Sequence, residues 1–272
     1  MGEPSTQIEN INWRAVWAEF VAMVLFVFIG CGSAVVITPG TAGDHLLVAL
    51  AFGFAITALV YTFAHVSGAQ INCAVTWALV LNETISAAQG IANFIAQLVG
   101  SCVGALFIQA ATTPHWKRAE AINYGANALG ALQADSVTAD VTHITKGNAF
   151  AVEFLMTFLL ITVVLQTAVN ADSKAGAHAA IAIGFAVFLA HAVSIPLTGC
   201  SINPTRSFGP AVVSDYWDDH WLWWVGPLSG STVAWLVNKK LLGPGDPEAD
   251  AQKQRERAAL AALDAEDAMV AL

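Results

Sequence analysis

Two asparagines of this chain occur in matching sequence contexts. Asn72 lies in the segment SGAQINCAVT and Asn203 in the segment TGCSINPTRS, and the offset between them also aligns the apolar runs that precede them. An asparagine amide and the first turn of a helix both present N–H donors and partial positive charge. Two such segments that meet would bind the oxygen of a small polar molecule from both sides. This is the chemistry of binding rather than of bond cleavage.

Three further side chains stand out because apolar residues surround them. Arg206 would cost about 2.5–3.5 kcal/mol at the centre of a lipid-facing helix, so it should face a wet interior. Glu19 and Glu153 lie in the first apolar run of each copy of the repeat. They are either proton carriers or buried acceptors for the backbone N–H groups of loops, and their duplicated placement favours the second role.

The sequence pattern does not favour an enzyme. The seven histidines show no metal-ligand spacing, and no glycine-rich phosphate loop or nucleophile beside a base occurs. We therefore expect no catalytic residue, metal or cofactor, and no nucleic-acid partner. We also expect free thiols, because the cysteines lie in or between apolar runs and not on the long polar connection. They are Cys31, Cys73, Cys102 and Cys200.

The composition indicates that the elements holding these residues lie in a lipid bilayer. Apolar residues make up 56% of the 272 residues and charged residues 11%, with a mean hydropathy of +0.61, whereas a soluble domain carries about 25% charged residues. Six apolar runs approach the ~20 residues that cross a hydrocarbon core of about 30 Å. They cover residues 15–37, 46–64, 91–111, 150–169, 179–195 and 221–242. The sequence predicts an all-α membrane protein.

The repeat divides the chain into half one, about residues 13–111, and half two, about residues 148–242. Each half holds three spans and a short segment, residues 72–81 or 203–213. Because three is odd, half two enters the membrane inverted. Each short segment would be about 15 Å long as a helix, half of the core thickness. We therefore expect two re-entrant half-helices that meet N-terminus to N-terminus and together complete one crossing, with Asn72 and Asn203 at the midplane.

Two segments flank this predicted membrane domain of residues 13–242: an N-terminus, residues 1–12, and a charged tail, residues 243–272, with a helical pattern from about residue 251. Lysine and arginine are more frequent on the side of the termini, which the positive-inside rule makes cytoplasmic. The residues on that side are Arg14, Lys174, Lys239, Lys240, Lys253, Arg255 and Arg257, against Lys117, Arg118 and Lys146 opposite. The plasma membrane is the default location.

Glycine pairs at helical spacing, residues 100 and 104 and residues 226 and 230, predict close helix packing.

The chain resembles the major intrinsic protein (aquaporin) family over about residues 13–242, and the resemblance implies that these residues form a channel domain around a central pore. The hallmark of that family is two Asn-Pro-Ala boxes on half-helices; here the boxes are Asn-Cys-Ala, residues 72–74, and Asn-Pro-Thr, residues 203–205. Cys73 replaces a proline whose fixed φ suits the first position of a helix, and Thr205 adds a hydroxyl. The resemblance implies a homotetramer and passive, osmotically driven permeation of water, excluding protons and ions.

The resemblance also implies a selectivity filter. Phe52, His191, Cys200 and Arg206 match the aromatic/arginine filter of the family. A phenylalanine, a histidine and an arginine would form a narrow polar throat that fits water and rejects polyols, since glycerol-conducting relatives usually carry a smaller residue at the position of His191. By the same resemblance, Glu19 and Glu153 support the two re-entrant loops.

Two alternatives stay open at this point. One is a channel for another small neutral solute, such as hydrogen peroxide, ammonia or glycerol; the filter residues argue against glycerol and do little to exclude hydrogen peroxide. The other is a proton-coupled secondary transporter that uses Glu19 and Glu153, because inverted repeats also build transporters. Regulation has one candidate: His178, at the start of the fifth span, is a possible gate because the charge of a histidine changes near neutral pH.

Overall fold

The computed structural model describes residues 11–37, 43–112, 122–130 and 144–243, and within them every regular element is a helix. Six of these helices are long. They are α1 (Trp13–Val36), α2 (Asp44–Ser67), α4 (Ala87–Thr112), α6 (Lys146–Val164), α7 (Ala179–Thr198) and α9 (Leu222–Val237). Two short helices, α3 (Cys73–Leu81) and α8 (Pro204–Ser214), follow α2 and α7. The predicted all-α fold is confirmed.

The long helices have the length and composition of membrane spans. Five segments qualify outright, α1, α2, α4 and residues 146–169 and 176–198. Two of these extend an α-helix by a turn of another type: η2 (Leu165–Val169) is a π-helix after α6, and η3 (Gly176–His178) is a 3₁₀ turn before α7. The sixth span is α9, which continues as the π-helix η4 (Asn238–Leu242). All six predicted spans are present, with ends shifted by a few residues.

The helices pack in a pattern that repeats between the two halves. In half one α1 packs on α4, and in half two the equivalent helices α6 and α9 pack on each other; α1 with α2 is matched by α6 with α7. The halves join where α2 crosses α7. This arrangement is the inverted repeat that three spans per half require, since an odd number of crossings reverses the direction of the second half.

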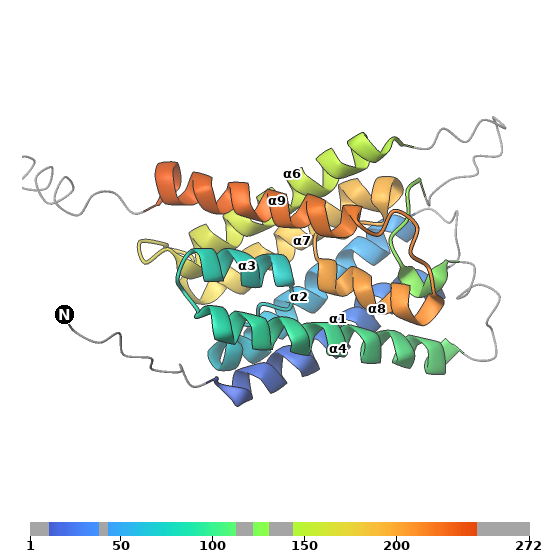
Figure 1. The fold of residues 1–272 in the computed structure, drawn as a ribbon, viewed down its shortest axis with the longest axis horizontal. Helices are drawn as coiled ribbons and strands as arrows, with labels where there is room; N and C mark the ends of the chain where they lie inside the picture. Colours follow the sequence, from blue (N-terminus) through green and yellow to red (C-terminus); the bar gives the residue numbers. More distant parts are fainter. Residues whose placement is uncertain (1–10, 38–42, 113–121, 131–143, 244–272) are drawn as a thin grey trace, which may run out of the picture.

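The two short helices lie inside the bundle. Each packs between α4 and α9, and α3 also touches α8. Figure 1 shows them in the middle of the molecule, running toward each other from opposite ends of the long helices. Each enters the bundle from one end and returns to the same end, so both are re-entrant half-helices, as the short apolar segments predicted.

Glycines allow the equivalent helix pairs to approach closely. A Cβ atom on Gly100 would lie 2.6 Å from the Phe20 carbonyl oxygen, and one on Gly104 would lie 2.7 Å from the Val24 carbonyl oxygen, both on α1. The α9 pair behaves alike against α6, where a Cβ on Gly226 would lie 2.7 Å from the Cβ of Glu153. The predicted role of these glycines in tight packing is confirmed.

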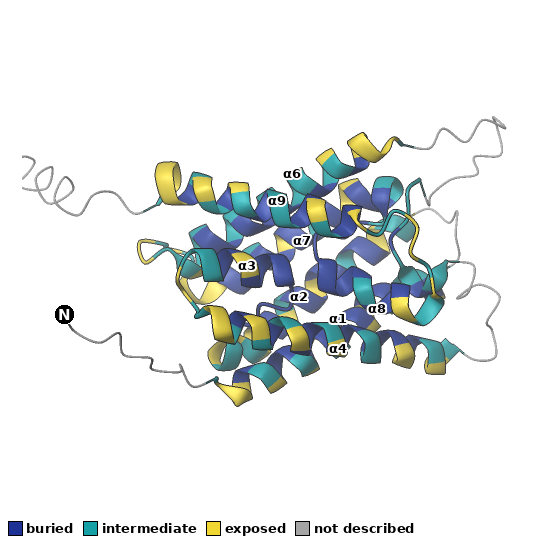
Figure 2. Ribbon diagram, in the orientation of Figure 1, coloured by how far each residue is buried: buried dark blue, intermediate teal, exposed yellow. Residues whose placement is uncertain are grey.

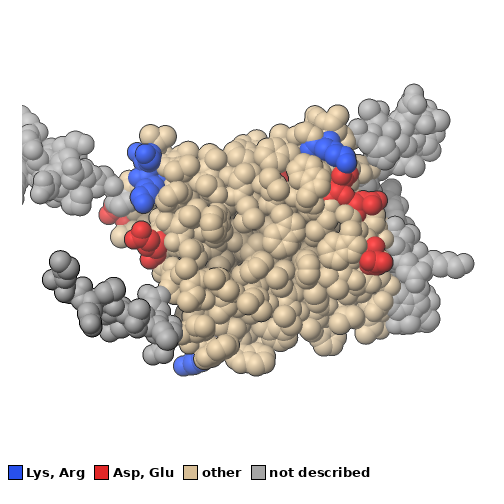
Figure 3. All heavy atoms as spheres, in the orientation of Figure 1, with Lys and Arg blue, Asp and Glu red and all other residues tan. Residues whose placement is uncertain are grey.

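The outer surface of the bundle is apolar. Large hydrophobic side chains are exposed on the outward faces of the long helices, as Figure 2 shows for one side. In Figure 3 the charged side chains gather at the two ends of the bundle, with an almost entirely uncharged band between them. Such a surface suits hydrocarbon and not water, and the chain is an integral, multi-pass membrane protein. Residues 1–10 of the predicted N-terminal segment, most of the long connection and residues 244–272 of the charged tail lie outside the described residues.

Candidate functional site

The two asparagines cap the short helices. Asn72 precedes α3, and its side-chain oxygen accepts a hydrogen bond from the Ala74 N–H at 2.8 Å. Asn203 precedes α8, and its side-chain oxygen accepts from the Arg206 N–H at 3.2 Å. Capping satisfies backbone donors that have no partner within a helix. It also fixes each amide with its oxygen toward its own helix, which directs the nitrogen elsewhere.

Each amide nitrogen crosses to the other half of the molecule. Asn72 Nδ2 donates to the Ile202 carbonyl at 2.8 Å, and Asn203 Nδ2 donates to the Ile71 carbonyl at 2.7 Å. Both asparagines are buried, at 5% and 2% exposed. The N-termini of α3 and α8 therefore meet at one point, and each asparagine has one further N–H available for a molecule at that point.

The loops that lead into the short helices are conformationally strained at matching positions. Ala69 and Ile71 have φ of 46° and 52°, and Cys200 and Ile202 have φ of 53° and 42°. This left-handed region is rare for non-glycine residues and most unfavourable for the β-branched isoleucines. Because both loops adopt the same unfavourable path, surrounding contacts must hold them there.

Two buried carboxylates make those contacts. Glu19 accepts from the Gln70 N–H at 2.9 Å and the Ile71 N–H at 2.7 Å. Glu153 accepts from the equivalent Ser201 and Ile202 N–H groups at 2.9 and 2.7 Å. A side-chain hydroxyl completes each set, from Ser67 to Glu19 and from Thr198 to Glu153, both at 2.6 Å. Both carboxylates are fully buried.

Three predicted filter residues lie together between the midplane and the far end of the bundle, where the long connection runs. The rings of Phe52 and His191 stack with centroids 4.0 Å apart, and the Arg206 guanidinium carbon lies 5.2 Å from the Phe52 centroid. A cation over an aromatic face is attracted by the ring quadrupole. Phe52 and His191 come from α2 and α7, the pair that joins the two halves, and Arg206 comes from the first turn of α8.

The Arg206 side chain is held by the long connection. Its Nη1 donates to the Gly125 carbonyl at 3.0 Å and to Asn127 Oδ1 at 2.6 Å. Asn127 also accepts from the Ser207 hydroxyl at 2.7 Å and donates to the Thr198 carbonyl at 3.0 Å. All these acceptors are neutral, so they orient the guanidinium without neutralising its charge.

Sequence reasoning missed Asn127 and Gly125. The connection has no apolar periodicity, and its asparagines and glycines are ordinary loop residues by type. One signal was available. Arg206, as a buried cation, needs hydrogen-bond acceptors, and the polar connection was the segment to which the sequence assigned no contacts. Gln97 was missed for another reason: it lies in the apolar run of α4, yet its Nε2 donates to Glu19 Oε2 at 2.9 Å.

Two polar atoms of the filter are buried without a hydrogen-bond partner among the described residues, His191 Nε2 and Arg206 Nε. His191 Nδ1 lies 2.8 Å from the Val187 carbonyl, which can only accept, so Nδ1 carries a hydrogen. In the neutral ring, Nε2 is then an acceptor, whereas Arg206 Nε is a donor. A buried polar atom left unpaired is costly, so His191 Nε2 leaves an acceptor and Arg206 Nε a donor open to a small molecule.

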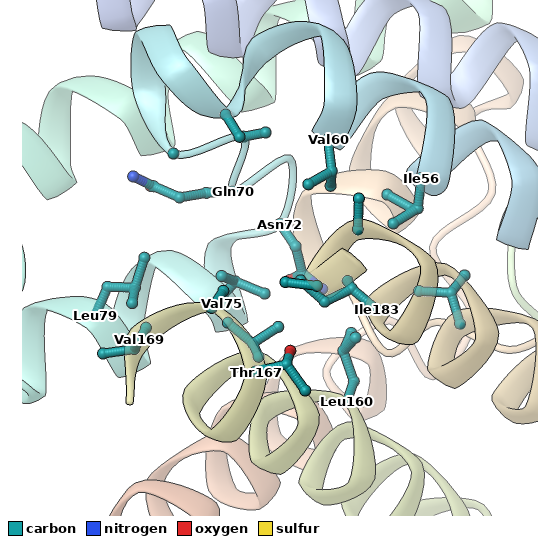
Figure 4. Close-up of a pocket in the computed structure, with 18 of the residues that line it drawn as sticks. Ile56, Val60, Gln70, Asn72, Val75, Leu79, Leu160, Thr167, Val169 and Ile183 are labelled. Carbon is teal, nitrogen blue, oxygen red and sulfur yellow. The ribbon is translucent and has the colours of Figure 1, made fainter. Parts of the chain in front are cut away.

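A cavity of about 660 Å³ occupies the half of the bundle nearer the described chain ends. Asn72 and Asn203 line its inner end. Its walls beyond them are mainly apolar, as Figure 4 shows with Ile56, Val60, Leu160 and Ile183 around the open space. The filter residues do not line it. The site therefore has two parts, with the asparagines between them. One is the cavity with mainly apolar walls, which we call the vestibule, and the other is the polar cluster of Phe52, His191 and Arg206, which we call the constriction.

The remaining predicted site residues lie at three places. Cys200 is fully buried on the loop before α8, and Cys73 and Thr205 face each other where the short helices meet. His178 is exposed at the start of α7. It is not among the residues that line the cavity, although its neighbours Ala177 and Ala179 are.

Comparison with known sequences gives consistent matches over most of the chain. A sequence model of the family described as Major intrinsic protein matches residues 6–238. Aquaporin-1 of Sus scrofa is 37% identical over 244 residues, covering 87% of this chain and 84% of its own. Aquaporin-2 of Ovis aries is 40% identical over 231 residues, covering 85% and 79%. Aquaporin-4 of Rattus norvegicus is 36% identical over 236 residues, covering 85% and 68%.

A solved structure has the same fold. The X-ray structure of the aquaglyceroporin from Plasmodium falciparum superposes with a TM-score of 0.71 and covers 85% of this chain and 97% of that chain. The sequence identity is 22%. At that identity the likeness shows the arrangement of the helices alone.

Proposed function

Because the chain belongs to the major intrinsic protein family, whose members are membrane channels for small solutes, we propose that it conducts water by passive, osmotically driven flow. The observation that carries this proposal is the pair of unpartnered polar atoms in the filter, His191 Nε2 and Arg206 Nε. Water both donates and accepts hydrogen bonds, and we propose that it is small enough to pass beside the Phe52 ring that stacks on His191. Polyols are larger, and we propose that they would have to displace that ring.

The same proposal accounts for exclusion of protons and cations. The N-termini of α3 and α8 meet at Asn72 and Asn203, and each contributes partial positive charge, roughly +0.5 at an isolated terminus. A water at the asparagines accepts hydrogen bonds from both amides and must turn its own hydrogens away. We propose that this orientation interrupts a proton wire and that Arg206, with only neutral acceptors, adds a barrier to cations.

The support for the loops completes the mechanism. We propose that Glu19 and Glu153 hold the strained loops that present the asparagines, through the N–H bonds described above. These oxygens accept from loop donors, and Glu19 Oε2 accepts from Gln97 as well. Carboxylates committed in this way are poorly placed to carry protons, which argues against a transporter. We propose further that Cys200 lies in the filter, that residues 13–242 form the channel domain, and that the channel is a homotetramer.

We propose that the vestibule faces the cytoplasm. The cavity opens at the end of the bundle that carries both described chain ends, and the excess of lysine and arginine at that end makes it cytoplasmic by the positive-inside rule. We propose the plasma membrane as the location. The filter would then face the outside of the cell, and the apolar vestibule would face the cytoplasm.

Stopped-flow light scattering of liposomes that contain the purified protein tests the water pore. An impermeant osmolyte should produce shrinkage much faster than in empty liposomes, and substitution of glycerol should give no re-swelling on that time scale. Glycerol entry would support the alternative of a wider solute channel. Flux that depends on an ion gradient, with no faster shrinkage, would contradict the proposal. A hydrogen peroxide indicator inside the same liposomes decides whether peroxide shares the pore.

We also retain the proposal that His178 biases a gate. It is the N-cap of α7, between Ala177 and Ala179, which line the cavity, so a charge there would act at the cavity wall. A fixed charge in His178→Lys should therefore change water permeability relative to His178→Ala in the liposome assay. Equal permeability of the two variants would dispose of this gate.

A further inference from the structure

The point where the two short helices meet is not symmetric. The internal repeat aligns Cys73 with Pro204, the first residues of α3 and α8, and Ala74 with Thr205. The N–H of the first residue of a helix has no partner within the helix. Pro204 has no N–H and needs none. Cys73 has one, and at 5% exposure it is buried.

Thr205 supplies the acceptor that Cys73 needs. The Cys73 N–H donates to Thr205 Oγ1 at 3.3 Å, across the junction of the two halves. At the equivalent place on the other side of the repeat, Pro204 lacks the donor and Ala74 lacks the hydroxyl. Donor and acceptor therefore occur together in one position and are both missing from the other.

The hydroxyl of Thr205 extends this contact to a pore residue. It donates to Asn203 Oδ1 at 2.7 Å, a closer acceptor than Gln97 Oε1 at 3.5 Å. Asn203 Oδ1 then accepts both from this hydroxyl and from the Arg206 N–H. An atom that receives two donors must be the amide oxygen, so Nδ2 is left to face the Ile71 carbonyl and the pore.

We propose that Cys73 and Thr205 are one coupled unit, in which the Thr205 hydroxyl satisfies the first N–H of α3 and fixes the amide orientation of Asn203. Thr205 is then a positioning residue for the midplane, and the inference rests on the proposed water pore only where it concerns flux. The two differences between the halves at this point compensate each other. Removing the Thr205 hydroxyl alone leaves the buried Cys73 N–H without its acceptor and Asn203 Oδ1 without one of its two donors.

A double-mutant cycle with Cys73→Pro and Thr205→Ala tests this unit in purified protein. Thr205→Ala alone should lower the apparent melting temperature by about 3 °C or more, as expected when a buried donor loses its partner in a chain of this size, and should reduce water permeability per reconstituted protein. In the Cys73→Pro background, the same change should lower the melting temperature much less. Equal losses in both backgrounds would overturn the proposal.

Thr205→Ser and Thr205→Val provide the matched control, because serine keeps the hydroxyl and valine keeps the shape. Thr205→Ser should retain both the melting temperature and the water permeability of the native protein. Thr205→Val should have a lower melting temperature and a lower water permeability. Equal behaviour of the two variants overturns the proposal even where Cys73→Pro does not fold. Native protein without water flux would refute the water pore, and the melting-temperature cycle would still decide the coupling.

Discussion

Arg206 is a buried charge whose side-chain hydrogen-bond acceptors among the described residues are neutral. It is 3% exposed, and its side-chain partners among the described residues are a backbone carbonyl and an amide oxygen. A buried cation is usually paired with a carboxylate. Here the neutral acceptors hold the guanidinium in place and leave its positive potential in the constriction. Arg206, the residue that is most costly to bury, is thus the one that makes the electrostatic potential of the proposed filter positive.

Replacement of His191 tests the width of the constriction. His191→Gly removes a ring that stacks on Phe52 and should admit glycerol. A steric barrier of about 1–3 kcal/mol corresponds to roughly 5-fold to 160-fold in rate, so glycerol permeability should rise by at least about fivefold in the liposome assay. Leu189→Ala, on the lipid-facing side of the same helix, should leave glycerol excluded. Unchanged exclusion in His191→Gly would refute the filter role of His191.

Cys200, which we propose lies in the filter, offers a chemical test. A mercurial bound to a thiol in the filter would obstruct flux, so the native channel should be inhibited and Cys200→Ser should resist. Cys102→Ser, on α4 and half-buried, is the matched control and should remain sensitive. If Cys200→Ser were inhibited as strongly as the native protein, Cys73 would be the next thiol to replace.

His220 predicts a pH dependence of stability outside the spans. It lies on the loop before α9, with its ring 4.9 Å from that of Trp217, and burial lowers its pKa below the ordinary 6.5. The unfolded chain then binds a proton more readily, so stability is present above pH 6.5 and is lost as the pH falls toward the lowered value. Thermal unfolding in detergent should show this fall, and His220→Phe should reduce it. An equal fall in both proteins would assign it to other groups.

At the scale of elements, the positions of helices followed from the sequence better than the contacts between them. Runs of apolar residues and the parity of three spans per half sufficed for the six spans, the inversion and the two half-helices. The repeat also pointed to Asn72 and Asn203, because duplication marks them independently of their type. Asn127 and Gln97 carried no such mark. Their partners, Arg206 and Glu19, are distant in sequence, so only the packing of the helices brings them together.

Close packing of α1 on α4 gives a matched pair of glycine substitutions. Gly100→Ala should destabilise the protein by about 1–3 kcal/mol, since the new methyl would lie 2.6 Å from a backbone oxygen. Gly32→Ala, on α1, meets nothing nearer than 3.7 Å and should be neutral or stabilising by about 0.5–1 kcal/mol, the usual helix preference for alanine. Unfolding in detergent measures both. Similar stability changes for the two would contradict the importance of this crossing.

On the scale of the whole molecule, the apolar band and the charged ends define how the bundle sits in a bilayer. The proposed direction follows from the vestibule end carrying the chain ends and most of the lysines and arginines. A membrane-impermeant thiol reagent applied to intact cells checks it. Asp218→Cys should be labelled and Ser173→Cys should be protected until the membrane is opened. The reverse labelling pattern would invert the proposed topology.

The crossed bonds between Asn72 and Ile202, and between Asn203 and Ile71, have a consequence for biosynthesis. The carbonyl that receives the Asn72 amide is added 130 residues later, roughly ten seconds of translation at typical speeds. During that interval the first loop has the Glu19 carboxylate and no partner from half two. We therefore expect the pore to take its final shape only after the ribosome has delivered residue 203, so that neither half forms a finished conduit without the other.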